Sequence, residues 1–220
     1  ASALGMTPAD YDPAHLPTNV AVEIKHDGIC LLDIDGSLRT LEGVPFECAA
    51  HLAEGLWKLR DAFGCPMVLQ GEYQEAGGFE ATLSAFQSRR GAGALFLSDA
   101  VPYAAWTGAE QSMSLRHRRA MLEAAWEVVK PDAIGLVGHA QHYDQEGVEL
   151  AAGAAWQDGL EGIVVKDLDA PYVRARSPFW MKVKREETID VPIQSVNTRL
   201  EAGQAVLESI VVTYEGRPVK

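Results

Sequence analysis

The 220-residue sequence contains only three cysteines, more acidic than basic residues and no long apolar run. Cys30, Cys48 and Cys65 stand at irregular spacing, which provides neither a disulfide framework nor a zinc site and is typical of a reducing cytoplasm. No apolar stretch approaches the roughly 20 residues that cross a bilayer. Residues 1–18 lack a basic segment followed by an apolar one, so the sequence predicts no secretory signal and no membrane partner.

The common phosphate-binding glycine loops are also missing. Neither a Gly-x-Gly-x-x-Gly nor a Walker-type sequence occurs, which excludes the two commonest nucleotide cradles. The formal net charge of −12 argues against a nucleic-acid partner, yet residues 161–185 carry six basic against three acidic residues. Because a binding face is set by local potential, the net charge does not decide the partner.

The composition that is present is globular. Hydrophobic residues make up 47% of the chain, which excludes a disordered protein and suits one or two domains. Strands outnumber helices and few strand–helix–strand crossovers are evident, which favours an α+β fold with antiparallel sheets. Residues 1–19 are expected to be an extended lead-in. The predicted strands lie at 20–34 with an interrupting turn, 38–41, 67–73, 94–101, 133–139, 163–166 and 179–183, and the predicted helices at 47–63, 79–87, 114–129 and 148–157.

From Val191 the pattern changes to β-strands with a Glu-Gly turn at 215–216. Thirty residues cannot bury a core alone. We interpret this region as the opening strands of a second β domain, with the boundary between residues 189 and 190.

Five short segments place charged groups among apolar strand residues, where an unpaired charge is costly to bury. In the segment at residues 180–184, the alternation of side chains along a strand puts Lys182 and Lys184 on one face. That face either meets solvent or lines an anionic site. Each segment alone has a structural explanation, since Lys-x-Asp-Gly is commonly a turn. The segments are Glu23-Ile24-Lys25-His26-Asp27-Gly28, Gly71-Glu72-Tyr73, the strand Leu95 to Asp99, Glu161-Gly162-Ile163-Val164-Val165-Lys166, and Trp180-Met181-Lys182-Val183-Lys184.

In this order and spacing, the five segments resemble motifs I, III, IIIa, IV and V of the ATP-dependent DNA ligases in the covalent nucleotidyltransferase superfamily. The resemblance covers about residues 20–189, and residues 79–89 are similar to the small bacteriophage-type ligases. It implies an ATP-grasp-like nucleotidyltransferase core at 1–189, with antiparallel sheets flanked by helices. The start of a truncated OB-type β domain would follow at 190–220.

The resemblance makes Lys25 the nucleophile, which attacks the α-phosphate of ATP to give lysyl–AMP and pyrophosphate. An amine with an ordinary pKa near ~10.4 is mostly protonated at neutral pH, so Lys25 needs activation. The cationic neighbours Lys182 and Lys184, with partial burial, favour the neutral amine and neutralise charge on the phosphate. AMP then passes to the 5′-phosphate of a nick in double-stranded DNA, and the 3′-hydroxyl displaces it.

The remaining expectations also follow from the resemblance. Glu161, with Glu72, is expected to hold Mg²⁺, a hard cation that prefers oxygen ligands. Glu72 suits a hydrogen bond to ribose, Lys166 a contact to phosphate, and Asp27 either orients the Lys25 turn or polarises the reacting hydroxyl. The expected nucleotide-binding residues are Ile24, Lys25, Arg39, Glu72, Phe96, Glu161, Lys166, Lys182 and Lys184, and the expected DNA-binding residues are Arg39, Arg174, Arg176 and Arg185.

Two positions depart from the family pattern. Cys30 stands where motif I usually has an arginine, a role that Arg39 is expected to share. Ser98 stands where an aromatic residue usually stacks on adenine. Phe96 lies on the same strand face and is either its substitute or part of the core.

Three functions remain open at the level of the sequence. The first is a monomeric DNA ligase of DNA repair, replication or recombination in a bacterial or phage-infected cytoplasm. The second is an RNA ligase or mRNA-capping guanylyltransferase of the same superfamily. The third is a non-catalytic remnant that binds nucleotide or nucleic acid, against which the retained lysines and glutamates argue.

Overall fold

A computed structural model describes residues 4–142, 144–185, 191–201, 204–214 and 217–219. The chain divides into two compact units, residues 1–185 and 186–220, and each is described by itself. The domain boundary predicted between residues 189 and 190 lies outside the described residues.

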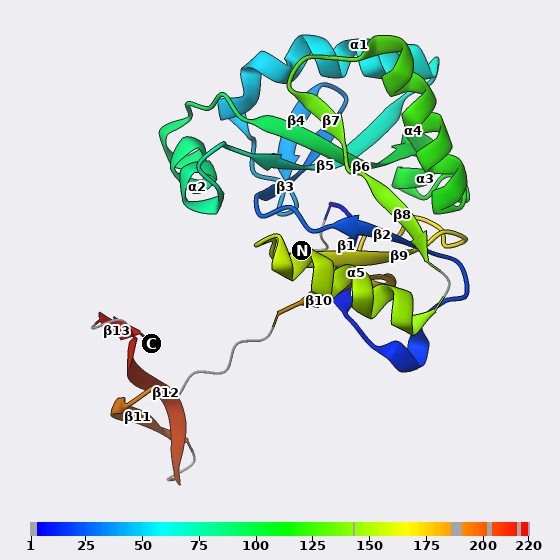
Figure 1. The fold of residues 1–220 in the computed structure, drawn as a ribbon. Coiled ribbons are helices and arrows are strands. Elements are labelled where there is room, and N and C mark those ends of the chain that lie inside the picture. Colours follow the sequence, from blue (N-terminus) through cyan, green and yellow to red (C-terminus); the bar gives the residue numbers. More distant parts are fainter. Residues whose placement is uncertain (1–3, 143, 186–190, 202–203, 215–216, 220) are drawn as a thin grey trace. The chain divides into compact units, whose positions relative to one another are not determined.

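Short strands and helices alternate along the first unit (Figure 1). Its strands are β1 (Thr7–Asp10), β2 (Val20–Ile24), β3 (Ile29–Ile34), β4 (Ser37–Thr40), β5 (Met67–Gln74), β6 (Ala94–Pro102), β7 (Ile134–Leu136), β8 (His139–His142), β9 (Gly162–Asp167) and β10 (Arg176–Lys184). Its helices are α1 (Ala53–Phe63), α2 (Phe79–Ser88), α3 (Tyr103–Thr107), α4 (Leu115–Val129) and α5 (Gln145–Gln157), with 3₁₀ turns at Pro13–His15 and Glu47–Leu52. None of the described helices is long and apolar enough to cross a membrane.

The strands of this unit form two five-stranded sheets. The β2 sheet has the order β1-β10-β9-β2-β8, and the β5 sheet has the order β4-β3-β5-β6-β7. The fold is therefore mixed α+β, as predicted. Most pairs are antiparallel, but β1 pairs with β10 and β6 with β7 in parallel. The expectation of wholly antiparallel sheets is wrong at these two pairs, because each joins strands separated by long connections, as parallel pairing requires.

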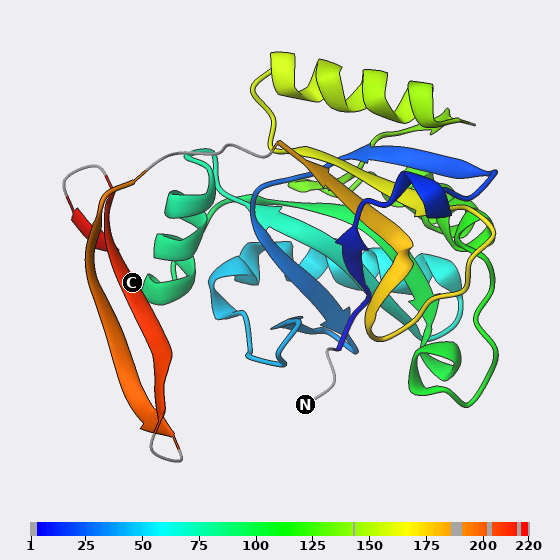
Figure 2. The same cartoon turned by 90° about the horizontal axis from the view of Figure 1, so that it is seen from below.

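Apolar side chains bind these sheets into layers. Helices α1 and α4 cover one face of the β5 sheet around Leu59 and Leu97. Helix α5 covers the outer face of the β2 sheet around Val148 and Val165. A third cluster, around Val68, fills part of the space between the two inner faces. The two views in Figures 1 and 2 show the sheets facing each other between these helices.

Residues 1–19 include a strand that the sequence did not predict, because β1 pairs with β10 at the edge of the β2 sheet and Met6 just before it enters a buried polar network. The Gln70 side chain accepts from the Met6 amide nitrogen (3.2 Å) and donates to its carbonyl (2.8 Å). The Tyr172 hydroxyl donates to the same Gln70 oxygen at 2.5 Å. The long-range partners that stabilise β1 explain why its own sequence, broken by Pro8 and Pro13, did not predict it.

Local sequence sets several element ends. The predicted turn at Asp35 and Gly36 has positive φ at both residues, +49° and +82°, as a two-residue hairpin requires. Gly64 closes α1 in the left-handed conformation, as predicted. Helix α5 begins at Gln145, three residues before the prediction. The Asp144 carboxylate caps its first turn by accepting from the backbone (2.8 Å).

The second unit is a small β-structure, as the pattern from Val191 indicated. Strands β11 (Ile193–Glu201), β12 (Gln204–Tyr214) and β13 (Arg217–Val219) pair antiparallel in sequence order. Apolar side chains such as Leu200 remain exposed. The predicted turn at 215–216 lies outside the described residues.

Candidate active site

The chain crosses from the β2 sheet to the β5 sheet at residues 25–28. The Lys25 amide donates to the Gly162 carbonyl at 3.0 Å, which fastens the start of this loop to β9. Gly28 lies against β5 so closely that a Cβ there would stand 2.2 Å from the Tyr73 carbonyl oxygen. Only glycine fits without moving the backbone. The loop is therefore attached to both sheets, and this fixes where Lys25 begins.

A cavity of about 220 Å³ lies between the sheets beside this loop. A more open hollow of about 700 Å³, near Trp57, contains none of the five segments, so its size does not make it the better candidate. The residues that were predicted to bind nucleotide and that line the smaller cavity are Ile24, Lys25, Glu72, Phe96 and Lys166.

Glu161 joins two of the predicted lysines. Its Oε2 accepts a hydrogen bond from Lys25 Nζ at 2.5 Å, and its Oε1 forms an ion pair with Lys184 Nζ. Burial pushes the Glu161 pKa upward, but the hydrogen bonds and charges of both lysines outweigh it, so the pKa lies below its ordinary value. We call Lys25, Glu161 and Lys184 the outer cluster, because their side chains are 20–43% exposed.

Glu72 on β5 has the opposite character. Burial raises its pKa to about 7, although the charge of Lys25 and a backbone hydrogen bond from Gly28 act against the shift. A carboxyl near neutrality exists in both protonation states at physiological pH. Glu72 is thus able to donate or accept a hydrogen bond on the cavity wall.

Lys182 is directed toward a residue that the sequence did not single out. Its Nζ lies 3.1 Å from Asp10 Oδ1 on the neighbouring strand β1, and Arg176 holds the other oxygen at 2.5 Å. Hydrogen bonding from Lys182, with the charges of both cations, lowers the pKa of Asp10. Lys182 and Lys184 are two residues apart on β10, and this spacing is what predicts that they share a face of the strand. No local pattern marks Asp10, since its role depends on β1 reaching β10.

Lys166 belongs to a second, buried set of charges. Its Nζ lies 2.6 Å from Glu23 Oε2 and 3.8 Å from the centre of the Trp180 ring. Lys166 and Glu23 are 2% and 4% exposed, and Arg119 Nη1 on α4 lies 3.9 Å from the other Glu23 oxygen. We call Glu23, Arg119 and Lys166 the inner cluster. Sequence reasoning missed Glu23, although its place two residues before Lys25 in an apolar strand was a signal.

Comparison with known families matches residues 108–184, about a third of the chain, to the model described as ATP dependent DNA ligase domain. The matched stretch includes Glu161, Lys166, Lys182 and Lys184. Residues 108–184 are therefore similar to an ATP-dependent DNA ligase domain. No curated protein matches its sequence.

Solved structures share the fold of this chain. The protein named Pmar-Lig_PreS3 is 19% identical with a TM-score of 0.80 over 99% of this chain and 54% of its own, so this chain spans about half its length. A Lig E DNA ligase is 18% identical with a TM-score of 0.73 over 97% and 81% of the two chains. The ATP-dependent DNA ligase of bacteriophage T7, solved with ATP, is 17% identical. Its TM-score is 0.67, over 98% of this chain and 79% of its own. At these identities the likeness establishes the fold.

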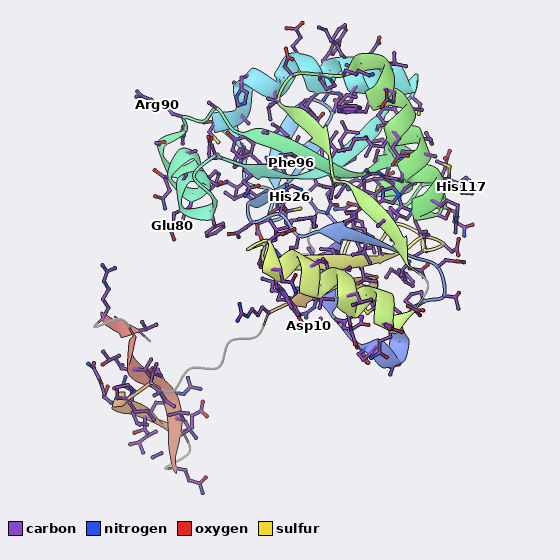
Figure 3. All side chains as sticks on the ribbon, in the orientation of Figure 1. Asp10, His26, Glu80, Arg90, Phe96 and His117 are labelled. Carbon is purple, nitrogen blue, oxygen red and sulfur yellow. The ribbon has the colours of Figure 1, made fainter. Side chains whose placement is uncertain are left out.

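Both residues that depart from the pattern of the resembling ligases, Cys30 and Ser98, line the cavity. Cys30 lies beside Gln70, whose Nε2 is 3.6 Å from its sulfur, and burial raises the pKa of the thiol. Ser98 lies at an irregularity in the pairing of β6 with β5. Phe96 stacks on His26 with ring centroids 4.3 Å apart (Figure 3). This stack was not foreseen from the sequence.

Other predicted residues lie away from the cavity lining. Arg39 donates to a main-chain carbonyl after β4 at 3.2 Å. The Arg174 guanidinium lies 4.1 Å from the centre of the Trp106 ring. Asp27 and Arg185 are exposed. Their assigned contacts with nucleotide or DNA stay predictions.

The predicted magnesium ligands are both carboxylates of the site, Glu161 and Glu72. Across the described part of the chain, no group of three or more His, Cys, Asp or Glu side chains is arranged for a metal. Glu161 and Glu72 interact electrostatically and offer hard oxygen donors. Mg²⁺ commonly takes one or two carboxylates together with phosphate oxygens and water, but both Glu161 oxygens are paired with lysines here, so the magnesium assignment stays a prediction.

Proposed function

We propose that this chain performs the nucleotidyl-transfer steps of an ATP-dependent DNA ligase that seals nicks in double-stranded DNA. The observation that carries the proposal is the outer cluster, in which Glu161 joins Lys25 to Lys184 beside the cavity. An amine nucleophile, a second ammonium group and a carboxylate are thereby gathered next to a space that contains further charged groups. This set suits an attack on a phosphate more than it suits passive binding.

In the first step, Lys25 Nζ forms a bond to the α-phosphorus of ATP while the bond to the pyrophosphate oxygen breaks. Lys25 is held by Glu161 in the structure, so the amine must leave this contact and lose a proton before it attacks. The phosphates of ATP offer Lys184 and Lys182 stronger anionic partners than one carboxylate each. The lysines then stabilise the charge that develops on the α-phosphate.

Glu72 and the hydrophobic wall are assigned to orienting the nucleotide. Glu72 contacts the ribose, while Ile24 and Phe96 contact the base, all from the cavity lining. Glu161 and Glu72 are the carboxylates that would hold Mg²⁺, whose contribution is to neutralise charge on phosphate oxygens. Lys166 reaches a phosphate from the same wall.

In the later steps, AMP passes from Lys25 to the 5′-phosphate of the nick, which regenerates the amine. The 3′-hydroxyl then attacks that phosphate and AMP leaves. Asp27 polarises this hydroxyl or orients the loop. We assign the three-stranded second unit to an OB-type fold that binds DNA. Phosphate contacts are assigned to Arg39, Arg174, Arg176 and Arg185, and such contacts make DNA binding sensitive to salt.

The test is self-labelling of the chain. The protein is incubated with Mg²⁺ and with ATP or GTP that is radioactive at the α-phosphate, and acid-labile label on the chain is measured. We expect labelling from ATP, none in Lys25→Ala, and ordinary labelling in the control Lys58→Ala, whose lysine pairs with Glu54 on the surface of α1.

Labelling from GTP alone would indicate a capping guanylyltransferase instead. Absence of label, in this chain and in a version extended to a complete second domain, would reject an enzymatic function and leave the binding remnant. Sealing of nicked DNA compared with nicked RNA then separates a DNA ligase from an RNA ligase.

A further inference from the structure

Two adjacent arginines near the start of α4 point in different directions and are both buried. Arg118 is 0% exposed and binds Asp99 through two hydrogen bonds of 2.9 and 2.8 Å, which ties α4 to β6 of the β5 sheet. Arg119 is 6% exposed and reaches the β2 sheet through Glu23. One turn of helix therefore connects both walls of the cavity, and Arg119 connects to the wall that holds Lys166.

Arg119 divides its charge between two carboxylates. Its Nε donates to Glu123 at 2.8 Å, its Nη2 donates to the Val137 carbonyl, and its Nη1 lies 3.9 Å from Glu23. Glu123 is 43% exposed, whereas Glu23 is 4% exposed. The buried Glu23 carboxylate is thus shared by two cations, Arg119 and Lys166.

This sharing leaves Lys166 only partly neutralised. Lys166 Nζ is within ion-pair distance of Glu23, but within the described residues it makes no hydrogen bond of good geometry. It is 2% exposed and lines the cavity. A buried ammonium that shares its one carboxylate with a second cation is incompletely compensated, and an anion that enters the cavity relieves that cost.

We propose that Arg119 is a positioning residue that acts through Glu23: by sharing the Glu23 carboxylate, it leaves Lys166 available to an anionic group of the nucleotide. The proposal rests on the proposed function for the identity of that anion, a phosphate of ATP. Without Arg119, Glu23 pairs with Lys166 alone and binds its side chain more firmly. Lys166 then contacts the nucleotide less well and its amine reacts more slowly.

The experiment measures how fast Lys166 is acetylated by acetic anhydride, read by peptide mass spectrometry, in the whole chain without nucleotide. We expect Arg119→Gln to slow acetylation of Lys166 by about threefold or more, because the variant removes a positive charge that competes for the Glu23 carboxylate. Arg119→Lys should restore the rate, and Arg116→Gln should leave it unchanged, because Arg116 on the same helix pairs with the exposed Asp169.

A purely structural role of Arg119 predicts the opposite sign. If its loss only loosened the fold, the buried Lys166 would become more accessible and would react faster. Faster or unchanged acetylation in Arg119→Gln therefore overturns the proposal. Should that variant not fold, Glu123→Gln tests the same contact. In this variant Glu23 is the only carboxylate that pairs with Arg119, so Glu23 holds Lys166 less firmly. Lys166 should then be acetylated faster, and slower acetylation contradicts the proposal.

A second readout links the inference to the nucleotide. The Kd of ATP, titrated without Mg²⁺, should rise about threefold to tenfold in Arg119→Gln, and this loss should vanish in a Lys166→Met background. A loss of the same size in that background overturns the action through Lys166. The two proposals fail separately: acetylation of Lys166 decides the role of Arg119, whereas absent self-labelling of the unmodified chain rejects the ligase function.

Discussion

The outer and inner clusters each place one carboxylate between two cations, but in different surroundings. Glu161 in the outer cluster is 23% exposed and its two lysines keep contact with solvent. Glu23 in the inner cluster is buried together with both of its partners. Exposed ion pairs exchange partners at little cost, whereas a buried pair is strongly destabilising when one partner is lost. The outer cluster is therefore suited to chemistry and the inner cluster to holding geometry.

The largest expected effect is on activity. Lys182 lies on the same face of β10 as Lys184, and it pairs with the exposed Asp10. Lys182→Ala should lower self-adenylation by about a hundredfold or more, since it removes a charge that stabilises the transferred phosphate. The melting temperature should change by no more than about 2 °C, as for other exposed pairs. Ordinary labelling in this variant would mean that motif V is wrongly assigned.

The next effect is on stability. Glu23→Ala leaves Lys166 and Arg119 buried without their shared carboxylate, and we expect a loss of about 3–5 kcal/mol in the free energy of unfolding. Urea denaturation of this variant and of Glu161→Ala provides the comparison. Equal losses at the two glutamates would remove the distinction between the clusters.

A third effect depends on pH and separates Glu72 from Glu161. The Glu72 pKa is raised to about 7 in the folded chain, so the native state binds more protons than the unfolded state between about pH 4.5 and 7. Its contribution to stability therefore falls as pH rises through that window, by up to about 3 kcal/mol. Glu72→Gln should remove this fall, so that the variant gains stability over the parent between pH 5 and pH 8.

The contribution of Glu161 to stability depends on pH with the opposite sign. Its pKa is lowered in the folded chain, so its contribution is complete above the unfolded pKa and is lost as pH falls through the folded value. Parallel urea titrations of Glu72→Gln and Glu161→Gln across pH 3–8 give both curves. If Glu72→Gln followed the parent curve at every pH, Glu72 would not be the buried carboxyl described above.

The smallest effect concerns Glu161 itself. Glu161→Gln at pH 7 should cost less than about 1 kcal/mol, and this difference should shrink in 1 M salt because exposed charges are screened. A loss that is large and independent of salt would show that the outer cluster is as rigid as the inner one.

Much of the fold follows from patterns within short stretches of the chain. The Asp35-Gly36 turn and the Gly64 helix end were predicted because a few neighbouring residues determine them. Strand β1 was missed, since its hydrogen bonds come from β10, more than 160 residues away in the chain. Local propensity carries no information about such a partner.

The same limit applies to the candidate site. Lys25, Glu72 and Lys166 were singled out through a resemblance in motif order, and the structure places all three on one cavity. Asp10 and Arg119 have no motif, because each acts on a residue far from it in sequence. Their importance becomes visible only when the sheets and α4 are assembled. The arginines assigned to DNA contacts remain predictions.

The crossing at residues 25–28 also bears on how the site arises during folding. Strands β2 and β3 are neighbours in sequence yet belong to different sheets, and Gly28 rests on β5 while the Lys25 amide rests on β9. Lys25 is therefore placed only after contacts of long sequence separation have formed in both sheets, and such contacts form late. A half-folded chain therefore lacks a correctly placed Lys25, and under the proposed function it is not expected to consume ATP before its fold is complete.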